Sequence, residues 1–340
     1  MIRYGLKVPG AATMIATALL AGAAFDMTHA GENTIIIDPP GAIATSSIAI
    51  NDRDVVAGDY TDEMVVTRVF IRTPKGSLKT FRVINETDTR VTALNNEGAI
   101  AGTYTNRSGN FEGFVRDAAG KVETFKITGL KSKDTQVVAM NDSGTIVGRW
   151  NSFPQHGFIR SADGTLTKFD APGALETFPA SINADGDVAG SYSDGHQNGH
   201  GFVRSADGAF TSFDAVQDSA TTAECIDDSG NVYGVWYDGS DVAHGFIRQA
   251  GGTIETFDLP DNKGNAAVRG VDRKGSIYGY YVDTSGVSHG FKRRADGKVV
   301  TFDVPGFTDT TPAGVNARGS VTGSVDSPTF SGFLRVRDKN

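Results

Sequence analysis

The sequence is short of cysteine, of long apolar runs and of long basic runs. The only cysteine, Cys225, excludes a disulfide framework, and we interpret it as a small buried residue of a strand. Beyond residue 30 no apolar run is long enough to cross a bilayer. Acidic residues outnumber basic ones, 40 against 32, which gives a formal net charge of -8. This balance argues against nucleic acid and anionic lipid as partners.

The first 30 residues have the pattern of a secretory signal peptide. Arg3 and Lys7 form a basic start, residues 8–25 are uncharged and rich in Ala and Leu, and Thr28-His29-Ala30 resembles a cleavage site. We therefore predict cleavage after residue 30 and a secreted or periplasmic protein. An uncleaved membrane anchor is the alternative, which Pro9 and the many small residues disfavour.

A Gly-Phe-apolar-Arg phrase repeats through the remaining chain. Its phenylalanine recurs at intervals of 44, 44, 44, 44, 45 and 42 residues, and glycine is abundant, with 42 residues. A period of this length is typical of a four-stranded propeller blade. The repeated residues are Phe70, Phe114, Phe158, Phe202, Phe246, Phe291 and Phe333.

Each repeat predicts four short antiparallel strands joined by glycine turns. Residues 157–160 and 165–170 form one expected hairpin, and residues 180–183 and 187–192 form the next. Asp-Gly turns link the two strands of each hairpin. A glycine in the second strand should allow neighbouring sheets to approach closely. The fold class is therefore all-β.

The two ends of the chain carry complementary parts of one repeat. Residues of about 34–38 match a fourth strand, and residues of about 331–337 match a third strand. Together they complete a seventh sheet, so we predict one seven-bladed β-propeller domain over residues 31–340. Closure matters because an open ring would leave two apolar sheet faces and an unpaired strand edge in water. A right-handed β-solenoid is the alternative, but it would not need complementary ends.

The repeats resemble a known bacterial family. A His-Gly-Phe phrase is followed, 26 residues after its first occurrence, by Ile-Asn-x-x-Gly-x-Val-x-Gly at residues 182–190. This combination is similar to the HAF family of bacterial extracellular repeats, over essentially the whole chain after residue 30. Here Gly stands where the family has Ala, and Arg68, Glu112 and Ser331 replace the histidine in three copies. The resemblance implies repeat architecture and export, and it carries over no catalytic residues.

The repeated histidines are predicted to be structural. Equivalent positions in different blades lie too far apart to bind one metal ion. An Asp after the fourth-strand Phe recurs with them, which favours hydrogen bonds inside each blade. The residues are His156, His200, His244 and His289, with Asp170, Asp214, Asp258 and Asp303. No motif for zinc, phosphate or nucleophilic catalysis occurs, so neither a metal nor a cofactor is expected.

The fifth and sixth repeats break the pattern. Three residues before the Asn or Asp that ends the first strand, five repeats carry Ile, Thr, Val or Ala, whereas the fifth has Glu224 and the sixth has Arg269. Their second strands are also unusually aromatic. Either an inter-blade ion pair beside ordinary strand aromatics or a ligand-binding wall near the central channel explains this pattern. The ligand-binding candidates are Tyr233, Trp236, Tyr237, Tyr278, Tyr280, Tyr281, Arg149 and Trp150.

Two classes of function fit these residues. The first is a monomeric, non-catalytic binding module for a carbohydrate or a cell-envelope component, favoured by uniform blade lengths and by the absence of a long insertion. The second is a propeller enzyme, a polysaccharide lyase or hydrolase. In that case Glu224 would be the base, Arg269 the charge neutraliser, and Tyr278 or Tyr280 the general acid. We favour the binding module.

Overall fold

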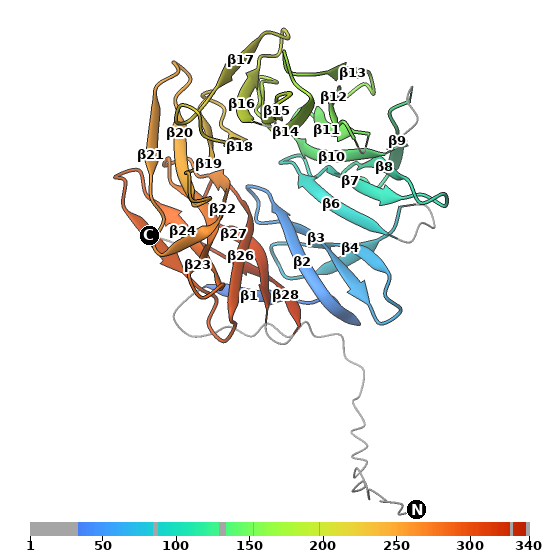
Figure 1. The fold of residues 1–340 in the computed structure, drawn as a ribbon. Coiled ribbons are helices and arrows are strands. Elements are labelled where there is room, and N and C mark those ends of the chain that lie inside the picture. The colour runs from blue at the N-terminus through green and yellow to red at the C-terminus, as the bar shows by residue number, and fades with distance from the viewer. Residues whose placement is uncertain are drawn as a thin grey trace, which may run out of the picture.

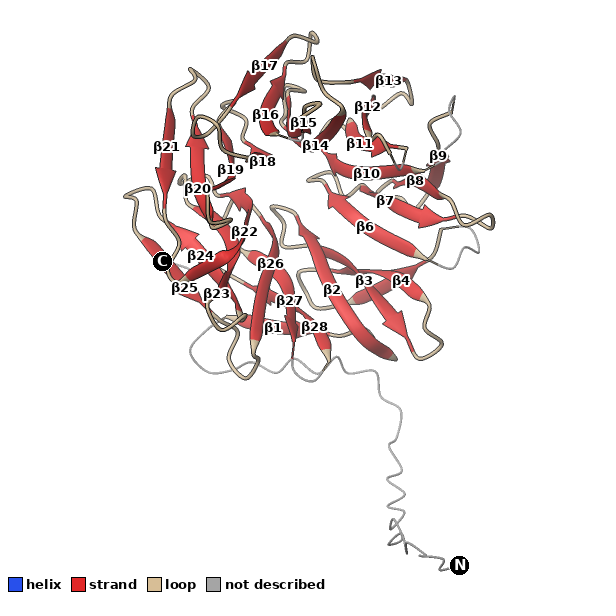
Figure 2. Cartoon of the chain, in the orientation of Figure 1, coloured by secondary structure: helices blue, strands red, loops and turns tan. Residues whose placement is uncertain are grey.

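The computed structural model describes residues 33–83, 88–128, 134–151, 153–196, 198–326 and 329–337. The predicted signal peptide lies outside these residues. Within them every regular element is a β-strand, and no helix is long and apolar enough to span a membrane (Figure 2). The strands form seven antiparallel sheets of four, arranged in a ring around a central axis (Figure 1). The predicted seven-bladed β-propeller is confirmed.

Six blades take four consecutive strands, from the innermost to the outermost. Blades 1 to 3 are β2 (Ala42–Ile50), β3 (Val56–Asp62), β4 (Thr67–Arg72) and β5 (Leu78–Phe81); β6 (Thr89–Leu94), β7 (Ile100–Thr105), β8 (Phe111–Arg116) and β9 (Val122–Phe125); and β10 (Thr135–Met140), β11 (Ile146–Trp150), β12 (His156–Arg160) and β13 (Leu166–Phe169). Blades 4 to 6 are β14 (Glu176–Ile182), β15 (Val188–Ser193), β16 (Gly199–Arg204) and β17 (Phe210–Phe213); β18 (Thr221–Ile226), β19 (Val232–Tyr237), β20 (Ala243–Arg248) and β21 (Ile254–Phe257); and β22 (Asn262–Val271), β23 (Ile277–Asp283), β24 (Ser288–Arg293) and β25 (Val299–Phe302).

Blade 7 is built from both parts of the chain. It contains β26 (Asp309–Val315), β27 (Val321–Asp326), β28 (Phe330–Arg335) and β1 (Thr34–Ile37), in that order from the inside. Thr34 lies opposite Arg335 and Ile37 lies opposite Gly332 in an antiparallel pair. The predicted seal of the ring by strands near residues 34–38 and 331–337 is therefore confirmed, with slightly shorter strands.

The ring has two different ends because all the sheets are antiparallel. The turns that join the first strand to the second and the third to the fourth lie at one end, which we call the turn end. The loops between the second and third strands, and the connections between blades, lie at the other, which we call the loop end. Since Thr34 pairs with Arg335 beside the turns, the described part of the chain both begins and finishes at the turn end.

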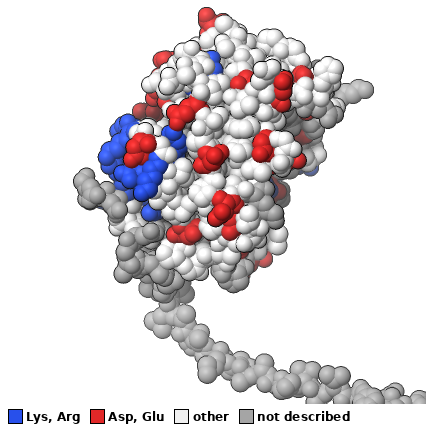
Figure 3. Space-filling view, turned by 60° about the vertical axis from the view of Figure 1, so that its left-hand side comes forward, with Lys and Arg blue, Asp and Glu red and all other residues white. Residues whose placement is uncertain are grey.

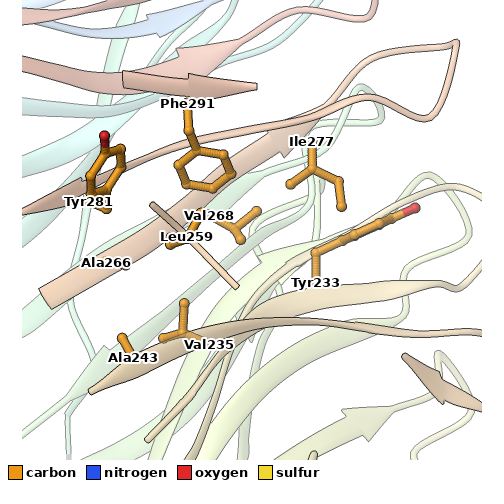
Figure 4. Close-up of a cluster of buried hydrophobic side chains, with 9 residues drawn as sticks. All are labelled: Tyr233, Val235, Ala243, Leu259, Ala266, Val268, Ile277, Tyr281 and Phe291. Carbon is orange, nitrogen blue, oxygen red and sulfur yellow. The ribbon is translucent and has the colours of Figure 1, made fainter. Parts of the chain in front are cut away.

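Apolar side chains fill the interfaces between blades. The phenylalanine repeated in each third strand is at most 1% exposed. In five interfaces it meets the fourth-strand phenylalanine of the preceding blade edge-on, with ring centroids 5.8 to 6.5 Å apart. Figure 4 shows one such interface, where Tyr233 and Val235 of blade 5 meet Ile277, Tyr281 and Phe291 of blade 6. Each blade thus needs a neighbour on both faces.

A glycine in each second strand makes room for this phenylalanine. In blade 4, Gly190 lies directly opposite Phe202 in the ladder. A Cβ atom on Gly190 would lie 2.3 Å from the carbonyl oxygen of Phe178 and 2.8 Å from the ring of Phe202. We expected this glycine to make room for the neighbouring sheet. The structure shows instead that it makes room for a phenylalanine ring of its own sheet. The equivalent glycines are Gly58, Gly102, Gly148, Gly234, Gly279 and Gly323.

We predict that Gly190→Ala lowers the free energy of unfolding by about 2–4 kcal/mol, because backbone and ring must both shift to admit one methyl group. Thermal and urea unfolding followed by circular dichroism would measure the change. Gly195→Ala is the matched control, since no atom lies within 4 Å of its added Cβ. Equal effects of the two substitutions would contradict this account of the repeat.

Candidate functional site

A β-bulge recurs in every innermost strand. The ladder between first and second strands shifts register by one residue at the same repeat position in all seven blades. A bulge leaves one residue unpaired and changes the direction of its side chain. The seven bulge residues are Ile48, Thr92, Val138, Ala180, Glu224, Arg269 and Ala313.

Six of the seven bulge residues line a cavity in the central channel. The cavity has a volume of about 650 Å³ and extends towards the loop end beside blades 4 and 5, where Gly199 and Ala220 line it. Four of the six are small and uncharged, whereas Glu224 and Arg269 bring opposite charges. Further lining residues are Arg149, Phe178, Ser181, Ser191, Tyr192, Ser193 and Thr222. The cavity therefore combines guanidinium groups, hydroxyls and aromatic rings.

The structure brings the predicted pair Glu224 and Arg269 together. Arg269 Nη1 lies 3.8 Å from Glu224 Oε1, and the backbone N–H of Val268 donates to Glu224 Oε2 at 2.7 Å. Burial raises the pKa of Glu224 to about 7, although Arg269 and the Val268 N–H both oppose this shift. The carboxyl group can thus gain or lose a proton near neutral pH.

The bond from Val268 to Glu224 is a variant of a repeated link between blades. A backbone N–H of the innermost strand donates to a side chain on the second strand of the preceding blade: Val137 to Thr103 Oγ1 at 3.0 Å and Ala223 to Ser191 Oγ at 2.9 Å. Blade 5 has Val235 at the acceptor position, which cannot accept. Glu224 supplies the missing acceptor, so it also has a structural role.

Arg149 and Tyr280 occupy the same acceptor position in blades 3 and 6. In the following blades, 4 and 7, the donor position is taken by Pro179 and Pro312, which have no N–H to donate. Because no acceptor is needed, these two positions can carry large side chains. Arg149 reaches the cavity, where its Nε donates to Gln136 Oε1 at 2.9 Å and burial lowers its pKa.

Tyr280 and Tyr237 lie beside the charged pair. The Arg269 guanidinium carbon lies 5.3 Å from the centroid of the Tyr280 ring, a cation–π distance. Burial raises the pKa of Tyr237, and the negative charge of Glu224 and the nearby Tyr280 add to the shift. Two of the predicted aromatic residues therefore surround the Glu224–Arg269 pair.

The structure places Tyr233 and Tyr278 elsewhere, at the turn end. Both side chains are buried, and their hydroxyls donate to Asp227 Oδ2 at 2.7 Å and Asp272 Oδ2 at 3.0 Å. In the other blades an Asn takes the place of Asp and donates to a backbone carbonyl of the next blade, as Asn316 does to Asn51 at 2.9 Å. Tyr233 and Tyr278 thus occur in the two blades that have Asp instead of Asn, where their hydroxyls bond to it. They do not line the cavity.

Trp150, Trp236 and Tyr281 pack against the repeated histidines. Ring centroids lie 4.9 Å apart for Trp150 and His156, 4.5 Å for Trp236 and His244, and 5.4 Å for Tyr281 and His289. A cavity residue, Tyr192, packs in the same way on His200 at 5.0 Å. Trp150, Trp236 and Tyr281 therefore pack within the blades and do not line the cavity, whereas Tyr192 does.

Each of the four histidines contacts the aspartate predicted for it. The Nδ1–Oδ1 distances are 3.0 Å for His156 and Asp170, 2.7 Å for His200 and Asp214, 2.7 Å for His244 and Asp258, and 2.8 Å for His289 and Asp303. Where the histidine is replaced, another polar contact stands in its place. In blade 2 the charges are exchanged, since Lys126 lies 3.7 Å from Glu112, and in blade 7 Ser331 donates to Asp38 at 3.0 Å.

Several cavity residues were not among the predicted site residues, and they include Phe178, Tyr192 and Ser181. Phe178 is the only aromatic residue at its repeat position, and this departure from the repeat could have marked it as a site residue. Nothing in the sequence singled out Tyr192, and only the structure shows that it borders the cavity. Within the described residues, no group of three or more His, Cys, Asp or Glu side chains could bind a metal ion.

The comparisons with known proteins agree on the fold. A streptogramin B lyase structure has a TM-score of 0.62 at 15% identity, over 89% of this chain and 97% of that one. A catalytically inactive virginiamycin B lyase from Staphylococcus aureus with quinupristin has a TM-score of 0.61 at 12% identity, over 89% and 99%. YCF48 bound to D1 peptide has a TM-score of 0.56 at 8% identity, over 92% and 98%.

At these identities the likeness defines a class, the propeller fold, and no activity. No family model and no curated protein matches the chain. The resemblance to HAF repeats therefore stays a prediction.

We predict that Glu224→Gln stabilises the protein at pH 8 but not at pH 4. In the folded protein the pKa of Glu224 is about 7, above the ordinary value of 4.5 for a glutamate, so the stability linked to the protonated carboxyl is lost as pH rises between these two values. Glutamine keeps an acceptor for Val268 without the charge, so the gain in unfolding free energy above pH 7 should be about 2–3 kcal/mol.

Urea unfolding across this pH range would measure the effect. Glu97→Gln, in an exposed turn, is the matched control and should leave the pH dependence unchanged. A constant difference between wild type and Glu224→Gln at all pH values would contradict the assignment.

We predict that His289→Ala lowers the melting temperature more at pH 5.5 than at pH 9. Burial disfavours the charged imidazole, but the hydrogen bonds that its N–H groups donate to Asp303 and Asp283 outweigh this effect and raise the pKa of His289. The stability that the charged His289 contributes is fully present below the pKa of an unfolded histidine and is lost as pH rises through its pKa in the folded protein. We therefore expect His289→Ala to lower the free energy of unfolding by about 1–2 kcal/mol at acid pH. Calorimetry at the two pH values tests it, and an unchanged melting temperature would refute the structural role.

Proposed function

We propose that the protein is a non-catalytic binding module that takes an acidic sugar, one carrying a carboxylate, into its central cavity. The observation that carries this proposal is the presence of two guanidinium groups, from Arg149 and Arg269, in one channel cavity. Arginine binds carboxylates through paired N–H donors in a fixed plane. Export, which the sequence predicts, would place such a module among extracellular or periplasmic glycans.

The rest of the cavity suits the remainder of a sugar. Ser181, Ser191 and Ser193 offer hydroxyls that can donate to and accept from sugar hydroxyls. Phe178 and Tyr192 offer aromatic faces for the apolar side of a pyranose ring. A volume of about 650 Å³ is within the usual range for small-ligand sites, which is roughly 300–1,000 Å³.

Glu224 would contribute selectivity to this site. In its protonated form it can donate a hydrogen bond to a ligand carboxylate, and in its charged form it repels one. A carboxylate-bearing ligand should therefore bind more tightly below pH 7 than above it, because the pKa of Glu224 lies at about 7.

The alternative is a lyase that acts on the same class of ligand. Arg269 would neutralise the uronate carboxylate, Glu224 would remove the proton at C5, and Tyr280 would protonate the oxygen that leaves C4 as the C4–C5 double bond forms. The near-neutral pKa of Glu224 favours this reading. Neither predicted acid is among the residues that line the cavity: Tyr280 lies against the Arg269 guanidinium, whereas Tyr278 is buried against Asp272 at the turn end.

We predict that an oligogalacturonate trisaccharide binds the protein and that Arg149→Gln or Arg269→Gln weakens binding about tenfold or more, since each change removes a charge-assisted contact. Isothermal titration calorimetry measures the affinity, and a neutral galactose trisaccharide should bind more weakly. Arg107→Gln, in an exposed loop, is the matched control.

Unchanged affinity in both cavity variants would refute the site, and no heat of binding at millimolar trisaccharide would refute the ligand class. Ultraviolet absorbance of an unsaturated uronate product, lost in Glu224→Gln, would decide for the lyase instead.

A further inference from the structure

Basic side chains gather on one side of an acidic protein. Figure 3 brings forward the left-hand side of Figure 1 and shows one compact group of Lys and Arg on a surface where Asp and Glu otherwise predominate. The group belongs to the turn end of blades 6 and 7. We call it the basic patch, and its members are Arg273, Lys274, Lys292, Arg294, Lys298, Arg318, Arg335 and Arg337.

Four separate segments assemble the basic patch. In blade 6 the first turn meets the second, because a Cβ on Gly275 would touch Ala295 at 4.0 Å. Blade 7 joins them, since the N–H of Arg273 donates to the carbonyl oxygen of Ala317 at 2.9 Å. Arg337, just after β28, donates from Nη1 to the carbonyl oxygen of Arg318 at 3.2 Å. These contacts to backbone groups join the segments without neutralising the cations, although Arg273 and Arg318 also form ion pairs with blade 1.

The charges within the basic patch repel one another. Burial lowers the pKa of Lys292, and the positive charges of Arg337, Arg294 and Arg335 lower it further, against the opposing effect of Asp272. Within the described residues, four acidic side chains stand against the eight cations, so the positive charge is only partly balanced. Asp52 pairs with Arg273 at 2.7 Å and Asp54 with Arg318 at 3.2 Å, whereas Asp272 lies 3.8 Å from Lys292 and Asp296 lies 3.9 Å from Arg294. Repulsion within a cluster of like charges destabilises the fold, and binding of a ligand of opposite charge relieves it.

The chemistry of the basic patch distinguishes between anionic partners. Among the described residues, its turns contain no aromatic side chain on which a nucleic acid base could stack and no large aliphatic side chain that could enter a membrane. Val300, on the neighbouring edge strand β25, is 41% exposed and stands alone there. A repeating anionic polymer without bases or acyl chains fits these features.

We propose that the basic patch of blades 6 and 7 binds an acidic polysaccharide along its sulfate or carboxylate groups. This site is distinct from the channel cavity, because the patch lies at the turn end whereas the cavity extends towards the loop end. Patch and cavity can therefore be tested separately.

The test uses heparin as the polyanion and surface plasmon resonance as the measurement. The wild-type protein should bind immobilised heparin at about 50 mM salt and lose it progressively as salt rises, since the contact is electrostatic. Arg294→Gln, Lys298→Gln and Arg337→Gln combined should weaken binding about tenfold or more. Lys75→Gln, Lys79→Gln and Lys121→Gln combined, with the same change in charge on blades 1 and 2, should change it less than about twofold.

Three results would overturn the proposal: no binding of wild-type protein at low salt, equal losses in the two triple variants, or binding to phosphatidylserine vesicles or duplex DNA as tight as to heparin. Melting curves must show that both triple variants are folded. The patch variant should keep its affinity for the oligogalacturonate trisaccharide, and Arg269→Gln should keep its affinity for heparin, so failure of one site is distinguishable from failure of the other.

Discussion

The structure depends on closure of the ring, because each blade has two apolar faces and cannot be stable with only one covered. Phe–Phe contacts between blades and buried Gly–Phe pairs within blades recur around the axis and cover these faces. Pairing of β1 with β28 satisfies it for the last interface, since it supplies the outermost strand of blade 7. Loss of that pair would leave the edge of β28 unpaired.

The candidate site arises from departures from the repeat at positions that packing leaves free. The bulge residue of each innermost strand is unpaired in the ladder, and six of the seven line the channel cavity, so Glu224 and Arg269 can stand where other blades have uncharged side chains. Arg149 and Tyr280 became possible because Pro179 and Pro312 removed the N–H groups that would otherwise need acceptors. A local change of backbone chemistry in one blade thus permits a large side chain in the preceding one.

Much of the fold was predictable from the sequence, because a period of about 44 residues and complementary ends leave few ways to bury the sheets. The meeting of Glu224 with Arg269 was also predictable, since both occupy one repeat position in adjacent blades. The burial of Tyr233 and Tyr278 was not, because it depends on the exchange of Asn for Asp six residues earlier. Nor was the basic patch, whose four segments are separated in the sequence and joined only by the turns of two blades.

The bulge has a consequence for how such rings diversify. Duplication of a blade copies its wedge and also copies one side chain directed at the axis. Point mutations at these positions can change the lining of the cavity while the phenylalanines and glycines that pack the ring stay the same. The lining and the packing are therefore set mainly by different positions of one repeat, and Glu224, which also links blades 5 and 6, belongs to both.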